Sequence, residues 1–107
     1  MIMSKGSLEN QLTAMLSELA SVETLQKLGH VSFLIKGKVF AFTRPQGVVL
    51  KLPTNRVADL VKSSPATVLV MGKRKMKEWV VMEYADSKKV NRDLPLFKEA
   101  LLFVSGQ

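Results

Sequence analysis

Residues 31–42 read VSFLIKGKVFAF, two apolar runs that meet at a Lys-Gly pair. Both runs are rich in β-branched and aromatic residues, which favours strands. Gly37 can adopt the positive φ that a tight hairpin needs. The stretch therefore predicts a β-hairpin with strands at residues 31–35 and 39–42.

The neighbouring sequence extends this hairpin into a larger sheet. Residues 48–52 predict a third strand of a meander, after a turn at residues 44–47 in which Pro and Gly hold type I positions. Residues 67–71 and 76–84 predict a second hairpin. Its link, Gly72-Lys73-Arg74-Lys75, carries three consecutive charges and should project into water.

Helices are expected before, between and after these strands. Apolar residues at helical spacing predict a helix over residues 8–19 with Ser7 as N-cap, packed on the sheet or, alternatively, on a partner. A short helix should span residues 53–63, and a final helix should begin near Pro95 and end near Val104. The order indicates an α+β fold: an antiparallel sheet, made of the meander plus the second hairpin, packed against N-terminal, middle and C-terminal helices.

Length and composition limit the classes of protein to consider. The 107 residues fit a single domain over residues 1–107, and an apolar share of 47% suffices for a core. The absence of Cys excludes disulfides and thiolate chemistry. No apolar run approaches the ~20 residues of a membrane-spanning helix, and the N-terminus does not resemble a secretory signal. We expect a cytoplasmic protein with no membrane partner.

Positive charge is concentrated in the middle of the chain. Residues 24–77 hold eleven basic side chains against one acidic side chain, Asp59, giving +10, whereas the first 23 residues carry −2 and the last 30 carry −1. A field of one sign on a small domain attracts polyanions. Nucleic acid is therefore the first partner to expect.

The residue types that carry catalysis are sparse. His30 is the single histidine, so neither a histidine-based metal site nor a two-histidine relay can form within one subunit. The carboxylates are scattered, and the glycines match no phosphate-binding loop pattern. We expect no enzymatic activity, no metal and no cofactor.

The second hairpin holds the densest group of basic residues. Side chains there could contact nucleic-acid phosphates, or they could simply keep a turn solvated. Residues at the two other turns would extend the group if those turns share one edge of the sheet. The candidate residues are Lys73, Arg74, Lys75 and Lys77, with Lys36, Lys38 and Arg44.

Aromatic residues beside this basic group raise a second possibility, since aromatic rings can stack on unpaired bases. Trp79 and Tyr84 flank the strand that follows the group. Both faces of that strand are apolar, which favours a core position for Trp79. The five phenylalanines are likewise expected in the core.

Three motifs resemble the N-terminal domain of the TfoX family. Residues 71–81, MGKRKMKEWVV, resemble its Gly…Arg-x-Met-Lys-(Glu/Gly)-aromatic-Val-Val run. Residues 37–41, GKVFA, and 49–53, VLKLP, resemble its Gly-Lys-(Met/Val)-Phe-Ala turn and Leu-(Arg/Lys)-Leu-Pro strand end. The order and spacing agree over roughly residues 8–104. One departure is at residues 27–30, KLGH, where the family usually has Met-Phe-Gly-Gly.

The resemblance implies an α+β fold related to YjbR/MmcQ-like bacterial domains, for which a winged contact with DNA has been suggested. Full-length TfoX proteins regulate competence genes and add a C-terminal domain. The leading hypothesis is therefore a non-enzymatic nucleic-acid-binding module related to transcription regulation that contacts mainly phosphates. The alternative is a protein-interaction domain, which could be a homodimer, whose basic face meets an acidic protein. The chain is expected to be a monomer or a homodimer. An exposed apolar patch beside the basic turn would favour this alternative.

Overall fold

The computed structural model describes residues 5–16, 18–19, 22–27, 30–44, 47–63, 66–84 and 87–106. The elements are α1 (Lys5–Leu16), β1 (Val22–Lys27), β2 (His30–Ile35), β3 (Lys38–Arg44), β4 (Gly47–Lys51), α2 (Thr54–Ser63), β5 (Thr67–Met71), β6 (Arg74–Glu83), the 3-10 helix η1 (Ser87–Asp93) and α3 (Leu94–Ser105).

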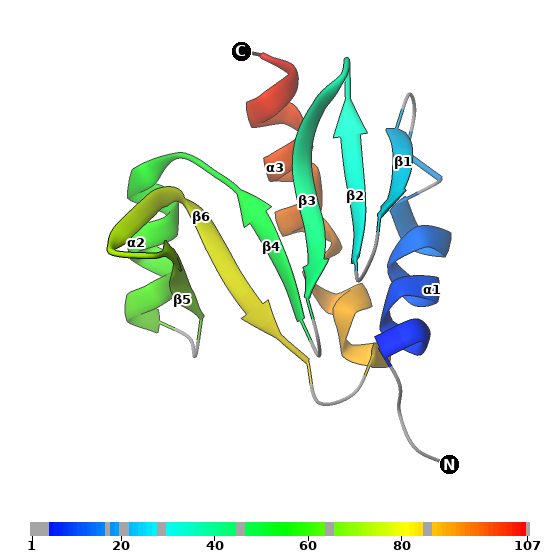
Figure 1. The fold of residues 1–107 in the computed structure, drawn as a ribbon, viewed down its shortest axis with the longest axis horizontal. Helices are drawn as coiled ribbons and strands as arrows, with labels where there is room; N and C mark the ends of the chain where they lie inside the picture. The colour runs from blue at the N-terminus through cyan, green and yellow to red at the C-terminus, as the bar shows by residue number, and fades with distance from the viewer. Residues whose placement is uncertain are drawn as a thin grey trace.

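The strands form one antiparallel sheet in the order β1-β2-β3-β4-β6-β5. The N-terminal, middle and C-terminal helices pack against it (Figure 1). This arrangement confirms the predicted α+β fold. The second hairpin joins the meander through its second strand, so β6 lies between β4 and the edge strand β5.

Strand β1 was not predicted. Its sequence, VETLQK, has two aliphatic residues, Val22 and Leu25, at odd spacing, so strand alternation places them on opposite faces and leaves no apolar stripe. The strand forms because its backbone pairs with β2 from Val22↔Ile35 to Lys27↔His30.

The ends of the first helix also differ from the prediction. Helix α1 begins at Lys5 and ends at Leu16, so Ser7 lies within the helix and Leu19 beyond it. The amide of Leu19 still donates a hydrogen bond to the Leu16 carbonyl at 3.0 Å, so the helical contact continues for one turn. Helix α2 ends at Ser63 as predicted, and Pro95 lies in the first turn of α3.

Positive φ angles mark the β2–β3 and β5–β6 hairpin turns. Lys36 (φ 54°) and Gly37 (φ 78°) form the link between β2 and β3, with the two positive φ values of a type I′ turn. Gly72 (φ 63°) begins the link between β5 and β6. That link has two residues, Gly72 and Lys73, because β6 begins at Arg74 rather than at Met76 as predicted. The central residues of the predicted turn at residues 44–47 lie outside the described residues.

The main core lies between the sheet and the helices. Phe33, Phe40 and Phe97 are fully buried there, as predicted, together with apolar residues from every helix. Each such side chain contributes roughly 1.5–3 kcal/mol by leaving water. A second, smaller cluster consists of Val49, Leu69 and Val81. Val49 and Val81 alternate with the core residues Val48 and Val80, so the second cluster lies on the opposite face of the sheet.

A buried tyrosine joins the end of β6 to the C-terminal helices. The Tyr84 hydroxyl donates a 2.6 Å hydrogen bond to Asp93 Oδ2, where η1 meets α3. Burial raises the pKa of Tyr84 far above its ordinary value, and the bond to Asp93 raises it further.

This contact predicts an abnormal tyrosine titration. Tyr84 is the single tyrosine, so tyrosinate absorbance reports on it alone. In denaturant it should ionise near pH 10, whereas the folded protein should require a higher pH. Since the folded pKa is the higher one, the contribution of Tyr84 to the free energy of unfolding is complete below about pH 10 and decreases above it. Titration near pH 10 in the folded protein would contradict this contact.

The sheet leaves no room for a side chain at Gly47. A Cβ atom there would lie 2.7 Å from the Met82 backbone carbonyl oxygen, an atom that cannot rotate away. Gly47→Ala should lower the free energy of unfolding by about 1–3 kcal/mol, measured by urea denaturation. Gly106→Ala is the matched control, because its nearest neighbour lies at 3.4 Å and its φ is −86°. Equal losses in the two variants would contradict the proposed steric limit.

Candidate nucleic-acid interface

A row of rings crosses the sheet on the face opposite the core, called here the open face. His30 of β2 meets the edge of Phe42 of β3 at a centroid distance of 6.2 Å. Phe42 lies 5.7 Å from Trp79 of β6 in a tilted arrangement. Lys51 of β4 continues the row, with its Nζ 5.5 Å from the centroid of the Trp79 ring. The open face thus combines aromatic surface with positive charge.

Strand register explains why these residues meet. Phe42 pairs with Val49, and Val49 pairs with Val81, so all three share one face. Trp79 lies two residues before Val81 and pairs with Lys51. The aromatic side chains are partly buried against the second apolar cluster.

Two aromatic residues differ in part from the prediction. Trp79 and Phe42 were expected in the core, and both are partly buried against the second apolar cluster, on the open face, where no helix of the described residues packs. Apolar residues on both faces of β6 suggested that both faces would be buried under other elements. In the structure, the face that carries Trp79 packs on the second apolar cluster and not on a helix. Tyr84, by contrast, belongs to the main core.

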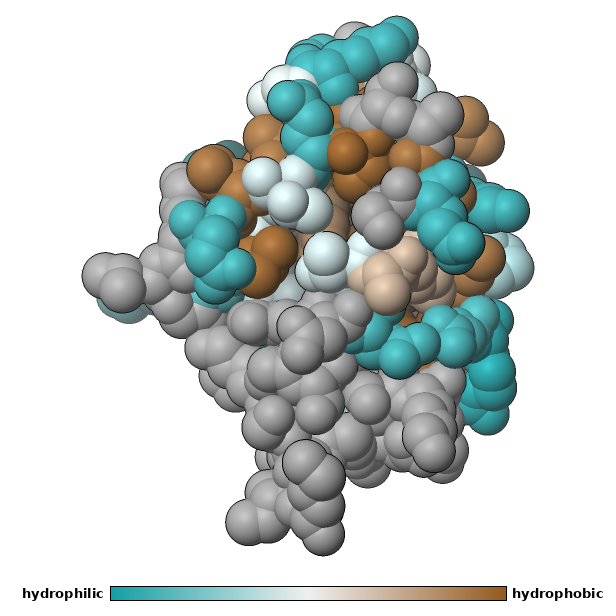
Figure 2. All heavy atoms as spheres, turned by 90° about the vertical axis from the view of Figure 1, so that its right-hand side faces the viewer, coloured by the Kyte–Doolittle hydropathy of each residue, from teal (hydrophilic) through white to brown (hydrophobic). Residues whose placement is uncertain are grey.

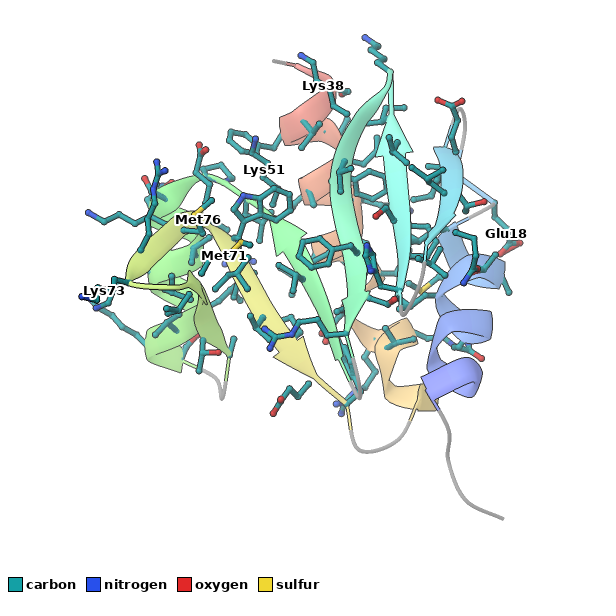
Figure 3. All side chains as sticks on the ribbon, in the orientation of Figure 1. Glu18, Lys38, Lys51, Met71, Lys73 and Met76 are labelled. Carbon is teal, nitrogen blue, oxygen red and sulfur yellow. The ribbon has the colours of Figure 1, made fainter. Side chains whose placement is uncertain are left out.

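A groove of about 420 Å³ runs beside the aromatic row. On one side lie His30, Phe42 and Arg44; on the other lies the end of β5, with Leu69 and Met71. Met71 is 60% exposed and the adjacent Val70 is 55% exposed. In Figure 3 Met71 lies over the sheet side of the β5–β6 hairpin, while Lys73 points outward at its tip. The groove is mainly apolar, with a guanidinium at one end.

Most of the predicted basic residues lie toward one end of the sheet, called here the basic end. Strand β4 runs toward this end and finishes at Lys51, while β6 runs away from it and starts with Arg74, Lys75 and Lys77. Lys38 begins β3 at the same end. Figure 3 shows Lys38, Lys51 and Lys73 spread along it.

Arg44 does not belong to this group. Successive turns of a meander lie at opposite ends of the sheet, so Arg44 at the end of β3 is separated from Lys38 at its start by roughly 20 Å of strand. The condition under which Arg44 would extend the basic group, a shared edge of the sheet, is therefore not met. Arg44 of β3 pairs with Gly47 of β4, and Gly47 pairs with Glu83 of β6, so Glu83 lies in the same row across the sheet as Arg44.

The turn residue Lys36 has a structural contact. Its Nζ donates a 3.5 Å hydrogen bond to the Ser105 carbonyl, where α3 ends. A lysine at this position interacts favourably with the negative end of the helix dipole. Lys36 therefore lies at the basic end, but it is directed toward α3.

The hairpin lysines and arginine are free of acidic partners within the described residues. Lys73, Arg74, Lys75 and Lys77 are exposed and take part in no ion pair there, whereas Arg56 pairs with Glu99 at 3.1 Å. The bond to Glu99 raises the pKa of Arg56. A second hollow of about 360 Å³ is lined by Arg74, Lys75 and Lys77, with Glu78 as its acidic member. The basic end thus keeps a positive charge that is available to an anion.

Metal-ligating side chains do not gather in the described residues. No three His, Asp or Glu side chains in this part of the chain lie close enough to share a metal ion. His30 lies edge-on to Phe42 at the start of β2. Across the same residues, no helix has the length and hydrophobicity required to cross a bilayer.

Sequence reasoning missed several members of the open face. Phe42 was assigned to the core, and neither Lys51 nor Met71 was named as a candidate. Alternation along β3 does place Phe42 and Arg44 on one face, but only the sheet order brings β5 and β6 beside them. Seen from the β1 edge, the described surface alternates between hydrophobic and hydrophilic patches (Figure 2). Leu25 of β1 is 44% exposed.

Comparison of this chain with protein-family models, with curated proteins and with solved structures finds no match. The site therefore has to be interpreted from its own geometry.

Proposed function

We propose that this chain is a non-enzymatic, cytoplasmic domain that binds nucleic acid. The observation that carries the proposal is the basic end of the sheet, where Lys51, Lys75 and Lys77 lie next to Trp79. Unpaired lysines release condensed counterions when they neutralise phosphates, which favours binding to a polyanion. Aromatic surface next to the same charges supplies a contact for bases.

The phosphate contacts should carry little base specificity. Lysine side chains in exposed turns contact phosphates, which are the same at every sequence position. The two-residue turn at Gly72 and Lys73 places the cations at the tip and first residues of a hairpin, from which they can follow a backbone. We therefore expect affinity that depends strongly on salt and weakly on sequence.

A relationship to the TfoX N-terminal domain is part of this proposal. It is supported by the three motifs at residues 37–41, 49–53 and 71–81, which fall on β3, on the end of β4 and on the β5–β6 hairpin. A role in regulating transcription or competence genes follows only through that resemblance.

A second candidate function has one specific observation in its favour. Val70 and Met71 are exposed immediately before the basic turn, which is the apolar patch expected of a protein-interaction surface. They lie on β5, an edge strand whose backbone can pair with another chain. In this alternative the basic end would contact an acidic protein.

The leading proposal predicts the effect of removing three charges. Replacing Lys73, Arg74 and Lys75 together with Ala should weaken binding to labelled DNA in fluorescence anisotropy. The log–log slope of affinity against salt, expected near −3 to −5 for the parent, should become less steep by up to about 3, at roughly −0.9 per phosphate. All three side chains, on the turn and the first two residues of β6, are exposed, so the unfolding midpoint should not change.

A matched control removes the same charge elsewhere. Lys62, Arg92 and Lys98 are exposed on α2, η1 and α3, the helices that cover the other face. Their joint replacement with Ala should leave the affinity much closer to that of the parent. Equal losses in the two triple variants would show that net charge alone drives binding and would contradict a contact at the hairpin.

A further inference from the structure

The groove on the open face has the surfaces that a planar aromatic ligand requires. The ring of Phe42 lies on one side, and the side chains of Leu69 and Met71 lie on the other. A flat ring between them would exchange water for aromatic and thioether contacts, which are favourable. The volume of the groove, about 420 Å³, falls in the usual range for small-molecule sites.

Charge at both ends of the aromatic row indicates what kind of planar ligand fits. Arg44 lines the groove at one end, and Lys51 contacts Trp79 toward the other. Arg44 pairs with Gly47, and Lys51 lies four residues further along β4, or roughly 13 Å away. A ligand lying along the row would have planar apolar groups in the middle and negative groups near Lys51 and near Arg44, where Glu83 in the same row supplies the opposite charge.

We propose that the groove binds an unpaired base of single-stranded nucleic acid, with the base stacked on Phe42 and the adjoining phosphates near Arg44 and the basic end. This inference rests on the proposed nucleic-acid binding and specifies its ligand. A duplex cannot bind in this way, because its base faces are stacked on one another. Stacking tolerates any base, since every base has an aromatic face.

A second copy of this chain fits the open face less well. A symmetric dimer places the same patch of each subunit against the other. Contact through this groove would bring Arg44 and Lys51 of one subunit near the same cations of its partner, and like charges in an interface are costly. The charge pattern therefore favours a polyanion.

The test separates the contribution of the bases to the affinity from the contribution of the phosphates. Binding of the intact protein is measured at low salt with a short oligothymidylate and with an abasic oligonucleotide of the same length and charge, in deoxyribose and ribose forms. Stacking predicts that the base-containing strand binds at least about 5-fold more tightly than its abasic counterpart in one or both sugar series. Emission from Trp79, the single tryptophan, should change more with the base-containing strand than with the abasic strand, whose phosphates reach only Lys51 and the basic end.

A matched pair of variants locates the contact. Phe42→Leu keeps an apolar side chain but removes the ring, and it should abolish most of the difference between the two oligonucleotides. Phe103→Leu makes the same change at a partly buried phenylalanine that packs on the main core, so the difference should remain. If Phe42→Leu does not fold, the comparison of oligonucleotides on the parent protein still tests the proposal.

The outcomes distinguish this inference from the proposed function. Equal, salt-dependent affinity for the two oligonucleotides in both sugar series would overturn base stacking and leave phosphate binding intact. No binding of any oligonucleotide or of duplex DNA at low salt would overturn both. Concentration-dependent self-association together with that absence of binding would point instead to a second copy on this face.

Discussion

The register of β4 between β3 and β6 is the constraint on which the rest of this structure depends. It aligns Phe42, Val49 and Val81 in one row and turns Val48, Leu50 and Val80 toward the helices. Because successive side chains of a strand point to opposite faces, burying one row under the helices leaves the other row on the open face. The aromatic row and the groove follow from that alternation.

Strand direction separates the charges in the same way. Neighbouring strands are antiparallel, so the end of β4 and the start of β6 lie at one end of the sheet, while the end of β3 lies at the other. Lys51 and Lys77 consequently gather near Trp79, and Arg44 stands apart. A polyanion that follows the aromatic row would meet positive charge at both ends. The proposed function and its ligand both depend on this separation.

The order of the last two strands gives the site its second wall. Strand β6 is the longer of the two, and between β4 and β5 it buries Val80 and Val81 on opposite faces. The shorter β5 remains at the edge and exposes Val70 and Met71. Had β5 paired with β4 instead, its end would not lie opposite Phe42 across a groove.

The sequence by itself determined most element types, most turn positions and the charge of the middle of the chain. Local periodicity, Gly37 and Pro95 carry that information, because backbone preference and side-chain alternation act over a few residues. Only the tertiary structure decided that residues 22–27 form a strand, that β6 precedes β5 in the sheet, and that Trp79 lies outside the main core. These features depend on pairing between segments far apart in the chain, and no local pattern records which strand will be the neighbour.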